Sequence, residues 1–260
     1  MMSVLLSLGQ GEIACAQTTV PADMVTIASG SYTTLLQSSK GEPIHVAAFY
    51  LDVYAVTNAQ YLAFVTANPQ WQRGHVPPLF ADSLYLQHWQ VDGEDSNPPK
   101  TLWQRPVTNV SWFAAKAYCQ WQHKRLPRVA EWEYVALASA DAPDASMDPV
   151  YLRQVLAWYS LPNPAVPPLR GSGGKNFWGV YDMHGVVWEW VANFNTALVT
   201  GESRGDSALE RNLYCGAGFV GVAEAQKVNY AAFMRYAYRS SLQGHYTVNN
   251  LGFRCAKDVQ

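Results

Sequence analysis

Residues 176–190 of this chain, NFWGVYDMHGVVWEW, gather several aromatic side chains around Gly179 and Gly185. The whole sequence has the same character, with ten tryptophans and fifteen tyrosines in 260 residues. Amphipathic aromatic side chains at this density favour irregular, loop-rich folds and wet binding grooves. We therefore expect an irregular, loop-rich architecture.

Toward the N-terminus, residues 24–32 and 43–54 are rich in β-branched and aromatic residues and predict strands. Residues 57–69 predict a helix that Thr57 caps and Pro69 ends. Two more helices are predicted after Ser111, with a break at Leu126-Pro127 and the second helix over residues 129–138. Residues 69–106 and 139–176 have loop composition. The chain has no internal repeat and no low-complexity linker, so the simplest organisation is one compact domain over residues 24–258.

The charge balance excludes some classes of partner. The formal net charge is -2, which gives no electrostatic reason to bind nucleic acid or an anionic membrane surface. No stretch approaches the roughly 18 apolar residues that a membrane span needs. We expect a monomer whose partner is a peptide, a protein or a small metabolite.

The first residues carry a partial export signal. A short apolar run, residues 4–8, precedes Ala14-Cys15-Ala16, which fits a small-x-small cleavage site, although no basic residue comes before the run. We predict an export signal over residues 1–16 and a periplasmic or secreted protein. A lipoprotein anchored at Cys15 fits less well, because Glu12 stands where an aliphatic residue is wanted.

Four segments in order resemble the formylglycine-generating enzyme, or sulfatase-modifying factor, family. They are VTNAQYLAF, RPVTNVSWFAAKAYCQW with KRLPRVAEWEYVA, NFWGVYDMHGVVWEW, and NNLGFRCAKD, and together they span most of the chain. The resemblance implies a single α+β domain of complex topology, related to C-type-lectin-like folds and low in regular secondary structure.

The same resemblance raises a conflict about activity. Members of known activity oxidise a cysteine of a sulfatase to formylglycine with copper(I), which two cysteines hold just upstream of the N-L-G-F-R-C ending. Counted back from Cys255, those two positions are Gln226 and Ala231. Copper(I) needs soft thiolate ligands. We therefore do not expect copper at the family site, and we expect no formylglycine synthesis by the known mechanism.

Two functions from different classes remain open. The first is oxidative maturation of a periplasmic protein or a metabolite, in which Cys215 (the candidate catalytic thiol), His245 or a bound substrate replaces the missing copper ligands. The second is a non-catalytic, chaperone-like module that binds a peptide or protein.

The form HGVVWEW resembles an exported branch of the family that is associated with nitrite reductase.

The resemblance also assigns structural residues. Cys119 and Cys255 match a family disulfide, the alternative being two buried thiols. Glu189, with the carbonyl oxygens of Gly185 and Val187, matches a calcium site, since calcium takes oxygen ligands. The alternative for Glu189 is a salt bridge between two tryptophans, and the alternative for Cys215 is an inert buried thiol.

The candidate groove residues cluster around the vacated copper position. Arginine forks and tyrosine hydroxyls of this kind suit backbone carbonyls or a carboxylate. For Arg254 we expect instead a role in binding buried loop carbonyls, and we expect Arg125 to pair with Glu131. The candidates are Trp190, Gln226, Tyr230, Ala231, Arg235, Tyr236, Arg239, Ser240, His245 and Asn250.

Overall fold

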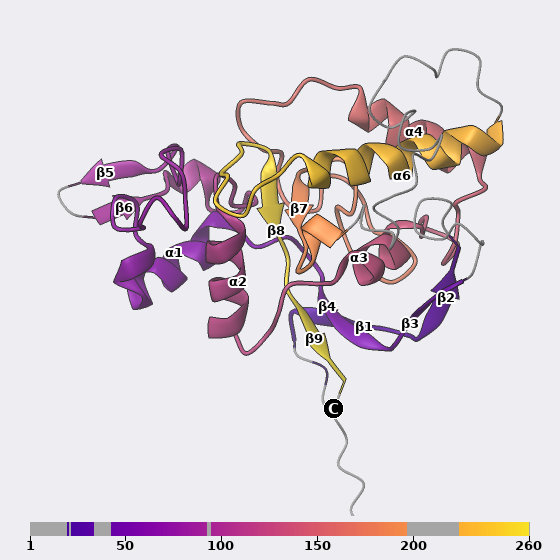
Figure 1. Ribbon diagram of the computed structural model, residues 1–260, viewed down its shortest axis with the longest axis horizontal. Coiled ribbons are helices and arrows are strands. Elements are labelled where there is room, and N and C mark those ends of the chain that lie inside the picture. The colour runs from indigo at the N-terminus through magenta and orange to yellow at the C-terminus, as the bar shows by residue number, and fades with distance from the viewer. Residues whose placement is uncertain (1–19, 21, 34–42, 93–94, 197–223, 260) are drawn as a thin grey trace, which may run out of the picture.

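The computed structural model describes residues 20, 22–33, 43–92, 95–196 and 224–259. Within these ranges short strands and helices are separated by long ordered loops (Figure 1). The helices are α1 (Asn58–Ala67), α2 (Trp112–Trp121), α3 (Val129–Ala136), α4 (Pro149–Tyr159) and α6 (Glu224–Ser240). Short 3₁₀ turns cover Pro69–Trp71, Lys100–Leu102 and Phe194–Thr196.

The strands form small sheets whose members are far apart in the sequence. β4 (Phe49–Asp52) pairs antiparallel with both β1 (Met24–Ile27) and β9 (Ala256–Asp258), so the two ends of the domain meet. β7 (Trp188–Trp190) pairs parallel with β8 (Leu251–Phe253). Two hairpin-like pairs complete the set: β2 (Gly30–Tyr32) with β3 (Ile44–Val46), and β5 (Gln90–Asp92) with β6 (Asp95–Asn97).

The pairing of β7 with β8 places Glu189 opposite Gly252. A Cβ atom at position 252 would lie 2.7 Å from the carbonyl oxygen of Val107, which is closer than side chains come to backbone atoms. Glycine is therefore needed at this point of the ladder, and it lets the C-terminal segment pack closely against the backbone of Val107.

The predicted helices begin where their caps were expected. The Thr57 side chain accepts from the backbone N–H of Gln60 and forms a capping box at α1, and Ser111 caps α2. The predicted loop over residues 139–176 is wrong in part, because it contains α4. Asp148 caps that helix, Pro149 occupies its first turn, and Leu152 with Val155 supplies its buried face.

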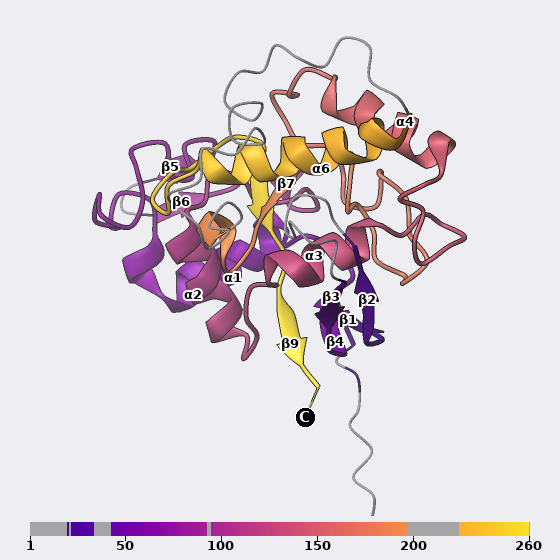
Figure 2. The same cartoon turned by 45° about the vertical axis from the view of Figure 1, so that its right-hand side comes forward.

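Helices α4 and α6 lie side by side and cover α3, on the side of the molecule opposite β9 (Figures 1 and 2). The core is strongly aromatic. Tyr61 stacks on Tyr118 with ring centroids 5.8 Å apart, and Phe253 meets both rings edge-on. These contacts between α1, α2 and β8 hold together elements that lack a continuous sheet.

None of the helices in the described ranges is long and apolar enough to cross a membrane.

Candidate functional site

Helix α6 carries both positions at which the copper cysteines of the family would lie. Ala231 is 3% exposed and offers only a methyl group. Gln226 belongs to the same helix, but the structure does not describe its side chain. The alanine side chain at position 231 has no lone pair to donate to a metal ion. The residues present therefore do not fit a copper(I) site.

The buried face of α6 also carries two arginines, and both are paired with Glu133 of α3. Arg235 donates from Nε to both carboxylate oxygens, at 3.0 and 2.9 Å, and from Nη2 to Oε2 at 2.6 Å. Arg239 donates from Nη1 to Oε1 at 2.5 Å, and its guanidinium lies 4.8 Å from the centroid of the Trp132 ring. We call Glu133, Arg235 and Arg239 the buried ion cluster.

The charges of this cluster are shielded from solvent. Burial alone would raise the pKa of Glu133, but the two guanidinium groups outweigh it and lower that pKa to about 2. Arg235 and Arg239 are 5% and 4% exposed. The prediction that they line an open groove is therefore wrong: buried charges must be paired, and here the partner is an internal carboxylate.

A polar chain leads from the buried ion cluster to His184. Arg235 Nη1 donates to the hydroxyl of Tyr159 at 3.1 Å, and that hydroxyl lies 3.5 Å from His184 Nδ1. The other ring nitrogen, Nε2, lies 3.1 Å from the carbonyl oxygen of Ala136, so it carries the proton and donates. Burial, with the nearby Arg235 charge, lowers the pKa of His184 to about 4. The ring is therefore neutral at pH 7.

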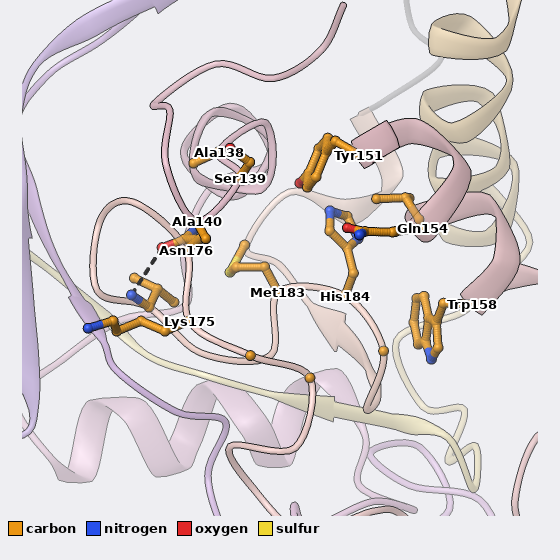
Figure 3. A pocket seen from close by; sticks show the side chains of 15 residues that line it. Ala138, Ser139, Ala140, Tyr151, Gln154, Trp158, Lys175, Asn176, Met183 and His184 are labelled. Carbon is orange, nitrogen blue, oxygen red and sulfur yellow. Dashed lines mark hydrogen bonds between the residues drawn. The ribbon is translucent and has the colours of Figure 1, made fainter. Parts of the chain in front are cut away.

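His184 forms one wall of a pocket of about 310 Å³ (Figure 3). The pocket lies between α4, the residues that follow α3, and the loop over residues 173–185. Tyr151 and Trp158 of α4 and the thioether of Met183 give it an apolar lining, and Gln154 and Lys175 add polar groups. A concave, mostly apolar space of this size with a few polar groups suits one or two side chains of a bound segment.

The other predicted groove residues do not meet at one surface. Trp190 is wholly buried and donates from Nε1 to the carbonyl oxygen of Val110 at 2.9 Å, so its predicted place in a groove is wrong. Tyr236 is 2% exposed and belongs to the core. Ser240 is exposed and bonds to the Ala237 carbonyl oxygen of its own helix.

Of the three remaining candidates, Tyr230 and His245 are partly accessible and Asn250 is buried. Tyr230 is half-buried on α6, where its ring stacks with Phe233. His245 lies in the turn after α6, and its backbone carbonyl accepts from the N–H of Asp82. Asn250 donates to the side-chain oxygen of Asn163 at 2.8 Å and so ties the end of the α6 segment to the loop after α4.

The residues of the expected calcium site do not fit a calcium ion in this structure. Both carboxylate oxygens of Glu189 accept from Arg254, at 2.8 to 3.0 Å, and Oε2 also accepts from the indole of Trp132 at 2.8 Å. Arg254 is wholly buried and supplies the positive charge there. Gly185 (φ +97°) and the buried Val187 lie in the same segment. With its carboxylate already neutralised by Arg254, Glu189 has no free negative charge to offer a calcium ion.

Two structural expectations from the sequence are confirmed: that Arg254 binds buried loop carbonyls, and that Arg125 pairs with Glu131. Besides its contacts with Glu189, Arg254 donates to the carbonyl oxygens of Asp52, Val53 and Tyr181. Arg125 pairs with Glu131 through two contacts of 2.7 Å.

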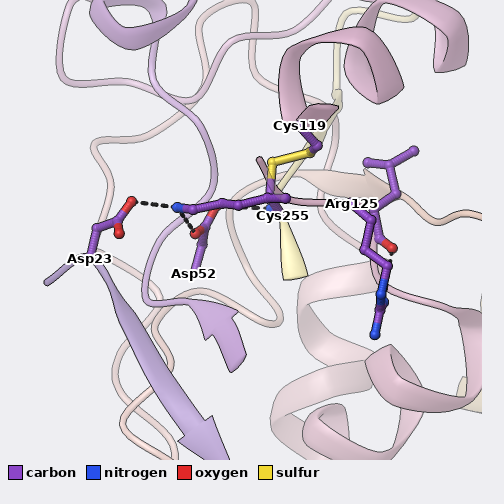
Figure 4. The surroundings of a disulfide bond; sticks show 7 residues. Asp23, Asp52, Cys119, Arg125 and Cys255 are labelled. Atoms are coloured by element: carbon purple, nitrogen blue, oxygen red, sulfur yellow. Dashed lines mark hydrogen bonds and ion pairs between the residues drawn. A yellow bond between two sulfur atoms is a disulfide. The ribbon is translucent and has the colours of Figure 1, made fainter. Parts of the chain in front are cut away.

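Cys119 of α2 and Cys255, which precedes β9, form a disulfide with their Cα atoms 5.6 Å apart (Figure 4). The bridge joins residues 136 positions apart and fastens the C-terminal segment to the centre of the domain. Cys215, the candidate catalytic thiol, and the export signal over residues 1–16 lie outside the described residues.

Sequence reasoning missed Glu133, Tyr159 and Tyr151. Glu133 stands in AEWEYV, where its position in the middle of an apolar helix face was the available signal. Tyr151 and Tyr159 lie on α4, in a region whose composition predicts a loop, so the sequence gives no reason to place them beside His184.

Three relatives and one family model place the chain among known proteins. The model of the sulfatase-modifying factor enzyme 1-like domain matches residues 10–259. The formylglycine-generating enzyme of Bos taurus is 26% identical over an alignment of 299 positions, which covers 95% of this chain and 78% of the relative. The inactive C-alpha-formylglycine-generating enzyme 2 of Bos taurus is 25% identical, covering 96% of this chain and 90% of the relative. The chaperone protein LppX of Paenibacillus barcinonensis is 23% identical, covering 78% and 84%.

Proposed function

This chain belongs to the sulfatase-modifying factor enzyme 1-like family, and we propose that it is an exported, non-catalytic accessory protein that binds a segment of a peptide or protein partner. The observation that carries the proposal is the composition of the buried face of α6. Ala231 stands where a copper thiolate is required, and the neighbouring arginines are neutralised by Glu133 rather than presented to a substrate. Copper(I) chemistry has no ligand at this position.

The pocket beside His184 supports the binding of a peptide or protein segment as the function. Its lining combines apolar walls from Tyr151, Trp158 and Met183 with polar groups from Gln154 and Lys175. Such a surface can hold an apolar side chain and orient the adjoining backbone. Relatives named as an inactive formylglycine-generating enzyme and as a chaperone protein are consistent with a binding role.

The disulfide supports export. Bridges of this kind persist in oxidising compartments and are rare in the cytosol, and Cys119 and Cys255 are joined. We place the protein in the periplasm or outside the cell, in the nitrite-reductase-associated branch that HGVVWEW resembles.

Oxidative maturation of a periplasmic protein or a metabolite is the second candidate function. One observation favours it: Cys119 and Cys255 pair with each other, so Cys215 is the cysteine left over once the leader is set aside. A reactive thiolate at Cys215 would be needed for this activity. The two functions differ in what the replacement Cys215→Ala does.

A selection from a random displayed peptide library tests the proposal. Wild-type protein should enrich a consensus peptide, and a synthetic copy should bind with the same Kd to the Cys215→Ala variant. Ala140→Trp, which places a large ring on an exposed residue that lines the pocket, should weaken binding by about tenfold or more. Ala157→Trp, on an exposed position of α4 that does not line the pocket, is the matched control and should bind as wild type.

Either of two results would overturn the binding role. One is a selected peptide whose binding is lost in Cys215→Ala but kept in Ala140→Trp. The other is the absence of any enriched consensus together with oxygen consumption on a thiol substrate, which would establish the enzyme.

A further inference from the structure

A second pocket, of about 480 Å³, shares no lining residue with the one beside His184. It is bounded by the end of β4 and by α1 and α2, with Arg170 from a distant loop closing one side. Its volume suits a molecule of drug-like size. Neither the copper positions of the family nor its calcium residues belong to it.

A buried ion pair belongs to the lining of this pocket. Lys124 and Asp52 have side chains 9% and 10% exposed, and the ammonium donates to Asp52 Oδ1 at 2.7 Å (Figure 4). Asp52 Oδ2 in turn accepts from the backbone N–H of Cys255 at 2.9 Å. Asp52 is thus held from two sides, directly beside the disulfide.

The second carboxylate on Lys124 is held much less firmly. Asp23 Oδ2 accepts from Lys124 Nζ at 2.6 Å, but its side chain is 56% exposed. An exposed carboxylate gains little from such a pair, because water solvates it almost as well. Asp23 can therefore leave the ammonium at small cost, whereas Asp52 cannot.

The walls of the pocket are aromatic and carry a further cation. Tyr54, Tyr118 and Trp121 line it, and the Arg170 guanidinium lies 5.1 Å from the centroid of the Tyr54 ring. Trp121 is 37% exposed, so part of its ring is open to a ligand. Aromatic rings bind flat apolar groups by stacking, and an arginine fork matches the geometry of a carboxylate.

We propose that this pocket binds a small aromatic carboxylate, whose carboxylate replaces that of Asp23 on Lys124 while its ring lies against Trp121 and Tyr118. The charge balance favours a single negative charge. Once Asp23 has moved away, Lys124 and Arg170 face only Asp52, which leaves one positive charge for the ligand to neutralise. Exchange of one carboxylate for another keeps Lys124 paired throughout. This site is independent of the peptide pocket.

Calorimetric titration with N-acetyl-L-tryptophan and with N-acetyl-L-tryptophanamide tests the proposal, since the two probes differ chiefly in the carboxylate. The acid should bind about tenfold more tightly than the amide, as expected for a hydrogen bond to a charged group. Asp23→Ala should strengthen binding of the acid by several-fold, because the competing carboxylate is gone. Arg170→Gln and Trp121→Ala should each weaken it.

Lys124→Met is the direct variant, but it leaves the buried Asp52 carboxylate without a counter-charge and can unfold the protein, so the variants of exposed residues carry the test. Ala140→Trp, in the other pocket, should leave binding of the acid unchanged. Equal binding of acid and amide would overturn the proposal. So would an affinity for the acid that Asp23→Ala, Arg170→Gln and Trp121→Ala all leave at the wild-type value.

Discussion

At the scale of single residues, two guanidinium groups of α6 share one carboxylate, that of Glu133. The resemblance places Arg235 and Arg239 in a groove, where they would suit backbone carbonyls or a carboxylate of a ligand; in the structure they bind an internal carboxylate instead. Their partner could not be identified, because it lies about a hundred residues earlier and is brought close only by the packing of α6 on α3. Residue type predicted the kind of interaction, and tertiary packing decided its partner.

Replacing Glu133 with glutamine should destabilise the protein strongly. The substitution leaves two arginines buried without a counter-charge, and breaking a buried pair in this way costs about 3–5 kcal/mol. The free energy of unfolding, measured in urea at pH 7, reports the loss. Arg128→Gln, which removes a 58%-exposed partner of Glu131, is the control and should change stability by less than about 0.5 kcal/mol.

The pH dependence of this loss provides a second check. The folded-state pKa of Glu133, about 2, lies below its unfolded value, so its contribution is complete above about pH 4.5 and disappears as the pH falls through 2. The difference between wild type and Glu133→Gln should be full at pH 5 and should shrink toward pH 2. A difference that is under about 1 kcal/mol at pH 7 would contradict the account.

At the scale of elements, α4 and α6 decide the site, and neither was evident in the sequence. The region of α4 is surrounded by proline, glycine and aspartate, which are typical of loops, although Asp148-Pro149 is a regular helix start. The resemblance assigns Ala231, Arg235 and Arg239 to a groove, whereas helical spacing puts all three on one buried face of α6. The helix α2 was predicted correctly, because its cap and apolar period agree.

The disulfide between α2 and the segment before β9 should stabilise the packing of these two segments more than any other single interaction does. Its loop of 136 residues gives a stabilisation of about 4–5 kcal/mol when the entropy of the unfolded chain is counted. The double variant Cys119→Ala/Cys255→Ala should lose much of this, measured as the shift of the urea midpoint. Chemical reduction of the wild type should lower its stability to a similar degree. A midpoint that neither treatment moves would show that the bridge contributes nothing.

At the scale of the whole molecule, the fold was the most predictable feature. Four segments in order indicated the family, and the family model covers residues 10–259. Those segments are predictable because they contain the core, such as Tyr61, Tyr118 and Phe253, where packing restricts residue type. The two pockets were not predictable, because their linings come from loops and exposed helix faces that contact one another only in the folded chain.

Elemental analysis of protein purified without chelators from its native compartment tests the central claim, that this member of the family binds a partner without copper chemistry. Copper, iron and calcium per chain would be measured for wild type and for Cys215→Ala. We expect no stoichiometric copper or iron in either protein, because position 231 is a buried alanine. Near-stoichiometric copper or iron that disappears in Cys215→Ala would reveal a rebuilt redox site and would contradict the account.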